Sequence, residues 1–153
     1  MRPTTAARPA WPWLLLVTAA STLAAFGCGG GGGGDSPTAP PAPGGTPTTL
    51  SQIQAQVFTP TCARVGCHDN ASGQAGLVLV AGQARANIVN VPSSQQPALS
   101  RVAPGIAEAS YLVRKVRGDA SITGARMPIS AAPLSQAQID GIIQWINGGA
   151  PDD

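Results

Sequence analysis

Apolar residues recur at helical spacing near the C-terminal end of the chain. The stripe consists of Ile139, Ile142, Ile143 and Ile146. Ser135 and Gln138 precede it at the spacing of a capping box, in which each side chain would satisfy a free backbone N–H of the first turn. Gly148 follows the stripe as a C-terminal stop signal. The pattern predicts an amphipathic helix over residues 135–147.

A second helical pattern runs from residue 49 to residue 58. Its apolar positions are Leu50, Ile53 and Val57. Thr49 and Gln52 stand at capping-box spacing at its start. Pro60 has no backbone N–H to donate, so we expect the helix to end there, directly before Cys62.

The residues between these two helices carry weaker patterns. Residues 84–89 and 110–117 predict short helices, whereas residues 70–76 and 92–97 are typical of loops and turns. In the second short helix, the residues at the right helical spacing to pack against the rest of the domain are Tyr111, Leu112, Lys115 and Val116. No strand pattern of regular spacing occurs. The sequence therefore predicts one small all-α domain over residues 50–153.

The N-terminal end has the composition of an export signal. Arg2 and Arg8 precede an apolar stretch over residues 13–26, which predicts a cleaved signal peptide over residues 1–27. The next residue, Cys28, lies between glycines as in bacterial lipoprotein cleavage sites, where the cysteine becomes lipid-bearing. We therefore expect an extracytoplasmic lipoprotein of the periplasm or cell envelope, held to a membrane by its lipid. Simple secretion with Cys28 as a free thiol is the alternative.

Residues 28–49 are rich in Gly, Pro, Ser and Thr and contain one charged residue, Asp35. Such a segment has almost nothing to bury, so it is expected to be a disordered tether between membrane and domain.

The charge balance argues against nucleic-acid binding. The chain has nine Lys and Arg against seven Asp and Glu, a formal net charge of +2. Loss of the signal removes Arg2 and Arg8, so the mature chain is formally neutral and has no broad basic field. The one basic cluster comprises Arg114, Lys115, Arg117 and Arg126. These residues could pair with acidic groups of a cofactor or partner, or form a solvated helix face.

The motif with the clearest chemistry is C-A-R-V-G-C-H, which places Cys62, Cys67 and His68 together. His68 is the only histidine of the chain. Two thiols followed at once by an imidazole match the needs of a covalently attached haem, whose vinyl groups accept sulfur and whose iron takes a nitrogen ligand. The cysteines are separated by four residues, whereas the common c-type signature has two.

A second candidate ligand is Met127, the only methionine besides the initiator. It lies between Gly124 and Pro128 in an irregular loop, and its thioether is a soft ligand suited to redox-active iron. Gap-filling in an apolar core is the alternative role for such a residue.

On these motifs, residues 50–151 resemble small bacterial c-type cytochromes, especially the cytochrome c-like modules of extracytoplasmic lipoproteins. The resemblance implies an all-α fold around one covalent haem c and transfer of single electrons to redox partner proteins. It further implies that Cys62 and Cys67 anchor the haem, with His68 as the proximal and Met127 as the distal axial ligand. Asp69 follows the histidine, where a glycine is more usual.

Two other interpretations of these residues stay open, and a third is disfavoured. If Met127 is structural, the open sixth position of the haem would suit a gas sensor or a weak peroxidase. Without haem, Cys62 and Cys67 would form a structural disulfide in a surface lipoprotein. A structural zinc site is disfavoured because Cys62, Cys67 and His68 supply only three of the usual four ligands. No catalytic triad, paired carboxylates or phosphate loop is visible, so an enzyme is not expected.

Overall fold

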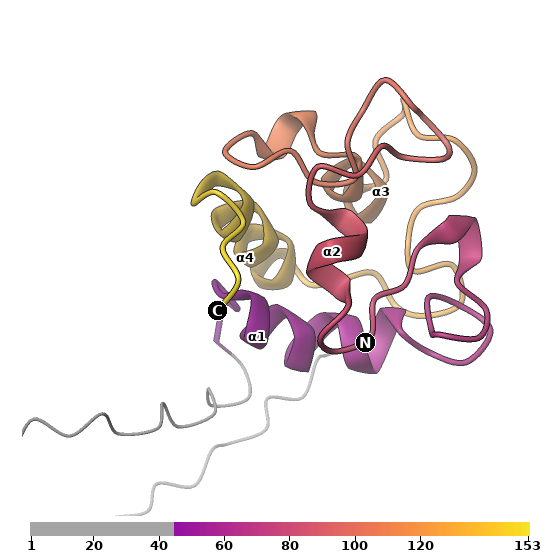
Figure 1. Ribbon diagram of the computed structural model, residues 1–153, viewed down its shortest axis with the longest axis horizontal. Helices are drawn as coiled ribbons and strands as arrows, with labels where there is room; N and C mark the ends of the chain where they lie inside the picture. The colour runs from indigo at the N-terminus through magenta and orange to yellow at the C-terminus, as the bar shows by residue number, and fades with distance from the viewer. Residues whose placement is uncertain (1–44) are drawn as a thin grey trace, which may run out of the picture. The chain divides into compact units, whose positions relative to one another are not determined.

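The computed structural model describes residues 45–153, and this part of the chain is helical (Figure 1). Its elements are α1 (Leu50–Ile53), the π-helix η1 (Gln54–Cys62), the 3-10 helix η2 (Gln74–Gly76), α2 (Ala84–Ile88), the 3-10 helix η3 (Ala107–Ala109), α3 (Tyr111–Arg117) and α4 (Gln136–Asn147). Pairing of extended backbone within residues 45–153 is limited to two isolated bridges, Val89 with Val102 and Pro92 with Ser100. The expected all-α class is thus confirmed for the described residues. The predicted signal peptide, Cys28 and most of the predicted tether lie outside them.

The first helical run is longer than the sequence predicts. Thr49 caps α1 as expected, because its Oγ1 accepts a hydrogen bond from the Gln52 amide at 3.3 Å. The Gln52 side chain reaches one residue further back than in a capping box and accepts from the Thr48 amide at 2.8 Å. From α1 the chain continues without a break into η1, which ends at Cys62.

The prediction that Pro60 ends this helix is wrong, since Pro60 lies inside η1. A proline has no backbone N–H, and in a π-helix, whose hydrogen bonds join residues five apart, the carbonyl that loses this donor is that of Ala55. The neighbouring carbonyl of Gln56 accepts from Nε2 of Gln138 in α4 at 3.1 Å. A side chain of a distant helix therefore binds the helical run next to the proline, and the run extends to the first motif cysteine.

Helix α4 is the central packing element, since it contacts α1, α3 and η3 (Figure 1). Its predicted capping box is confirmed: Ser135 Oγ accepts from the Gln138 amide at 3.3 Å, and Gln138 Oε1 accepts from the Ser135 amide at 2.9 Å. Three of the four predicted stripe residues, Ile139, Ile142 and Ile146, are buried, and Ile143 is half-buried. The helix ends at Asn147 as predicted, but Gly149 rather than Gly148 adopts positive φ, at +95°.

The remaining core gathers around α4. Trp145, which lies off the isoleucine stripe, is 1% exposed, and its indole N–H donates to the Pro151 carbonyl at 3.0 Å. Other fully buried side chains are Ile53, Val57, Phe58, Leu79, Ile88, Val102 and Val113. Pro47, within the predicted tether, is also buried and packs against Gly141 of α4. The packed part of the chain thus begins before residue 50.

Candidate functional site

Cys62 is the last residue of η1, so the helix delivers the motif at its C-terminal end, as predicted. Its side chain is half-buried and packs against the hydrophobic core. The five following residues turn back on it: the Cys67 amide donates to the Arg64 carbonyl at 2.9 Å, and the His68 amide donates to the Cys62 carbonyl at 3.1 Å. The backbone of His68 is therefore held directly beside that of Cys62.

The two motif cysteines have different environments. Both are free thiols, Cys62 half-buried and Cys67 exposed. Burial, assisted by the nearby charge of Cys67, raises the pKa of the Cys62 thiol to about 11. Cys62 is therefore a protonated thiol near neutral pH.

His68 is fixed by the segment that follows the motif loop. Its Nδ1 lies 3.2 Å from the Leu77 carbonyl oxygen, and its own carbonyl accepts from the Leu79 amide at 2.8 Å. A carbonyl only accepts hydrogen bonds, so Nδ1 donates in this contact, and Nε2 is the ring nitrogen that can offer a lone pair to a metal. Leu79 is 1% exposed, so the hydrogen bond from its amide ties the backbone of His68 to the core.

Asp69 closes the motif loop, a role that the sequence analysis missed. Its carboxylate accepts from the Ser72 amide at 2.6 Å, and Ser72 Oγ accepts from the Gly66 amide at 3.1 Å. The backbone hydrogen bond from Ser72 is the main cause that lowers the pKa of Asp69 below its usual range. An Asp at the first position of a tight turn is the available sequence signal for this role.

Met127 lies in the loop after α3, far along the chain from the motif. Its side chain is half-buried, and its backbone amide donates to the Lys115 carbonyl at 2.9 Å. None of the hydrogen bonds found within residues 45–153 joins this loop directly to the C-A-R-V-G-C-H loop.

A third segment links the two loops. On one side Ser94 Oγ and the Arg101 guanidinium donate to the Ala75 carbonyl, at 2.9 and 3.0 Å, just after the motif loop. On the other side the Gln96 side-chain amide donates to the Ser121 carbonyl in the loop that leads to Met127. Residues 94–101 therefore connect both candidate ligand loops to one part of the fold.

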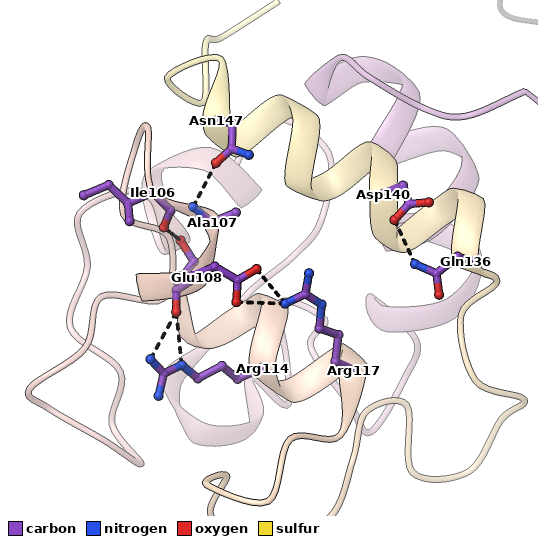
Figure 2. A network of polar contacts seen from close by, with 9 residues as sticks. Ile106, Ala107, Glu108, Arg114, Arg117, Gln136, Asp140 and Asn147 are labelled. Atoms are coloured by element: carbon purple, nitrogen blue, oxygen red, sulfur yellow. Dashed lines mark hydrogen bonds and ion pairs between the residues drawn. The ribbon is translucent and has the colours of Figure 1, made fainter.

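The predicted basic cluster does not form a free basic surface, because its members bind oxygen atoms of their own chain. Arg117 pairs with Glu108 at 2.7 Å, and Arg114 donates to the Glu108 carbonyl at 3.1 Å (Figure 2). Arg126 Nε donates to the Val116 carbonyl at 2.9 Å. Lys115 is only 7% exposed, and its Nζ donates to the carbonyls of Thr123 and Ala125.

The burial of Lys115 agrees with its predicted place among the packing contacts of its helix, since it lies four positions after Tyr111 and therefore on the same, buried face of α3. The alternative of a solvated helix face is wrong for this residue. Its hydrogen bonds to the loop carbonyls of Thr123 and Ala125 are the second role that the sequence does not predict.

The hollows found on the described surface lie away from these residues. One of about 600 Å³ is formed between α1 and α2, with Leu50, Arg85 and Asp153 in its wall. Another of about 570 Å³ lies near Pro60 and Ser135. Cys62, Cys67, His68 and Met127 line neither. Neither of these two hollows is therefore part of the candidate site.

The donor set nevertheless suits a covalently attached haem, the group that the resemblance implies. Two free thiols and an imidazole with an available Nε2 stand in one short loop, and the proton on Nδ1 is held by a backbone carbonyl, the usual second partner of a metal-bound histidine. A cluster of three or more His, Cys, Asp or Glu side chains that could hold a metal ion does not occur in residues 45–153. A haem iron that binds one histidine and one methionine does not need such a cluster.

Comparisons of the chain with protein-family models, curated proteins and solved structures give no match. None of the helices within residues 45–153 has both the length and the apolar character needed to cross a membrane.

Proposed function

We propose that residues 50–153 form a monohaem c-type cytochrome domain that carries single electrons between redox partner proteins. Cys62 and Cys67 would hold the haem through thioether bonds, and His68 Nε2 and Met127 Sδ would be its axial ligands. The observation that carries the proposal is the 3.2 Å contact between His68 Nδ1 and the Leu77 carbonyl, in the same loop as two free thiols.

The His68 contact supports ligation for an electrostatic and an entropic reason. A hydrogen bond from Nδ1 fixes the neutral tautomer with its lone pair on Nε2, and it makes that nitrogen a stronger donor to a metal. The hydrogen bond between the backbones of His68 and Leu79 holds the residue to the core, so little freedom remains to be lost when the imidazole binds.

Both motif cysteines are free thiols, as covalent attachment to haem vinyl groups requires. The raised pKa of Cys62 keeps this thiol protonated near neutral pH and slow to oxidise. Exposure of Cys67 leaves the second thiol accessible.

Apolar side chains beside the candidate ligands provide further support. Large hydrophobic residues of the described part are notably exposed at three positions, Val65 at 93%, Ile129 at 65% and Ile106 at 58%. Val65 lies between the two motif cysteines, and Ile129 lies two residues after Met127. Both loops that carry candidate ligands therefore expose an apolar side chain, and coverage of such a side chain by an apolar macrocycle would be favourable by the area removed from water.

The expected chemistry follows from filled axial positions. Bound haem would supply an iron atom that alternates between the ferrous and ferric states. If His68 and Met127 both bound the iron, no position would be left for substrate, and the chain's residues would bind and shield the cofactor without acting as an enzyme. The export signal over residues 1–27 and the lipid on Cys28 belong to the same proposal and would hold the domain at a membrane of the periplasm or cell envelope.

The direct test is the intact mass of the full chain after co-expression with haem-attachment machinery. We expect the mass of one haem that survives denaturation, together with the added mass of lipid at the N-terminus. The double variant Cys62→Ser, Cys67→Ser should retain the lipid but lose the covalent haem, which makes it the matched control. Wild-type protein that stays colourless and carries no haem mass would disprove the proposal.

A further inference from the structure

The loop that carries Met127 is fastened to α3 at several points, all on one helix face. The Tyr111 hydroxyl accepts from the Thr123 amide at 2.9 Å, and the Lys115 carbonyl accepts from the Met127 amide at 2.9 Å. Lys115 also reaches the loop with its side chain, since Nζ donates to the carbonyls of Thr123 at 3.0 Å and Ala125 at 2.8 Å. One residue therefore contacts the loop through both its backbone and its ammonium group.

Burial makes these ammonium contacts obligatory. Lys115 is only 7% exposed, and a buried charged group is costly unless hydrogen bonds replace the water that it has lost. An ammonium group offers three donors and no acceptor, so carbonyl oxygens turned inward are suitable partners. The two carbonyls of Thr123 and Ala125 must therefore point toward α3, which defines the path of the backbone just before Met127.

The backbone of this loop is not stabilised by regular secondary structure. Residues 119–127 form no helix or strand, and Gly124 adopts a φ of +73°. Arg126 reinforces the fastening, because its side chain packs over Gly118 while its Nε donates to the Val116 carbonyl at 2.9 Å. Without partners on α3, an irregular glycine-containing loop of this kind would be mobile.

We infer that Lys115 is a positioning residue for Met127: its ammonium group and carbonyl hold the loop in the conformation that presents the thioether to the haem iron. The inference rests on the proposed function and adds a role that the ligands themselves do not supply. A loop that is already ordered favours methionine ligation. The conformational entropy of the loop is then lost when the protein folds and not when the thioether binds the iron.

The test compares haem-loaded Lys115→Met with wild type. Methionine preserves much of the apolar stem but removes all three donors. We expect the covalent haem mass to be retained, while the charge-transfer absorption of methionine-ligated ferric haem is lost or strongly reduced. Hydrogen exchange of the Met127 amide should become about tenfold faster or more as the loop is released.

Arg117→Met is the matched control. It removes a cation from the same helix, but this cation binds Glu108 and does not bind the loop. This variant should keep the absorption and the exchange rate of wild type. Lys115→Arg, which restores charged donors, should recover part of the lost absorption. If Lys115→Met keeps the full absorption and slow exchange at Met127, the inference is overturned while the proposed function stands.

A measurement on wild type covers the case in which Lys115→Met does not fold. Its Met127 amide should exchange as slowly as the amides of α3, and exchange at the rate of an open loop would overturn the inference. Wild type without covalent haem would overturn the proposed function and the inference together. Wild type with covalent haem but no methionine absorption would overturn only the inference and the assignment of Met127.

Discussion

The side-chain amide of Gln138 donates to the Gln56 carbonyl at 3.1 Å and so joins the first turn of α4 to the helix that leads into Cys62. The same side chain closes the capping box with Ser135 through its Oε1 atom. One glutamine therefore caps the last helix and binds the helical run that contains Pro60. The C-terminal helix thereby contributes directly to the position of the first motif cysteine.

Replacing this glutamine should destabilise the fold more than replacing its neighbour. Gln138→Ala loses half of the capping box and the hydrogen bond to the Gln56 carbonyl, and we expect a loss of about 1–2 kcal/mol in the free energy of unfolding. Gln136→Ala is the control, since Gln136 is exposed and its side chain binds only Asp140, one turn further along α4 (Figure 2). Urea unfolding of both variants gives the comparison. Equal stability of the two would contradict the assigned role.

Gly141 should not tolerate a methyl group although it lies within a helix. Alanine normally improves a helix at an exposed glycine position. Here the new Cβ would overlap the Pro47 carbonyl oxygen and lie 2.9 Å from its carbon, so the incoming segment would have to move. We expect Gly141→Ala to lower the free energy of unfolding by about 1–3 kcal/mol, as overpacking does.

Gly45→Ala is the control for this substitution, because no atom lies within 4 Å of the position that its new methyl group would take and the residue is exposed. Thermal unfolding should show a lower midpoint for Gly141→Ala only. A midpoint for Gly141→Ala above that of wild type would show that Pro47 does not pack there in solution.

The helices could be predicted where local signals agree. Capping at Ser135, the isoleucine stripe of α4 and the short helices α2 and α3 all follow from residues that are close in sequence. The end of the first helix could not be predicted in this way. Pro60 is a strong local stop signal, but the π-helix continues past it and is bound there by Gln138, which lies 82 residues away from Gln56.

In the candidate site, too, some features follow from residues that are close in sequence and others depend on residues that are far apart. The chemistry of Cys62, Cys67 and His68 is readable from their order in the chain. The clamp from Leu77 on the imidazole and the fastening of Met127 by Lys115 depend on irregular segments, for which no periodic pattern exists. Burial of the Lys115 ammonium needs two backbone carbonyls that only the folded loop provides.

The two motif thiols should differ in reactivity before haem is attached. Cys67 is exposed, whereas Cys62 is half-buried and burial raises its pKa to about 11, so little of its reactive thiolate is present near pH 8. Treatment of the haem-free protein with iodoacetamide should label Cys67 at least about tenfold faster than Cys62. Peptide mass mapping measures each cysteine separately and also distinguishes Cys28.

Denatured protein is the control for this labelling, since unfolding should bring the two rates close together. Labelling of Cys62 as fast as Cys67 in the folded protein would contradict the packing of Cys62 at the end of η1. Failure of both thiols to react, with recovery after reduction, would instead indicate a disulfide and favour the structural-lipoprotein alternative.

Substitution of Met127 by leucine separates the two haem-based interpretations. Leucine keeps the apolar volume of the side chain but has no sulfur, so packing should be preserved while the ligand is lost. If Met127 binds the iron, the variant should retain covalent haem, lose the methionine charge-transfer absorption and have a lower reduction potential, because a thioether ligand favours the ferrous state. Ser130→Ala, an exposed neighbour in the same loop, is the control and should keep the wild-type absorption. Spectra and potentials of Met127→Leu that match those of wild type would assign Met127 to packing. Binding of carbon monoxide by reduced wild type would then identify the open sixth position that a sensor or peroxidase requires.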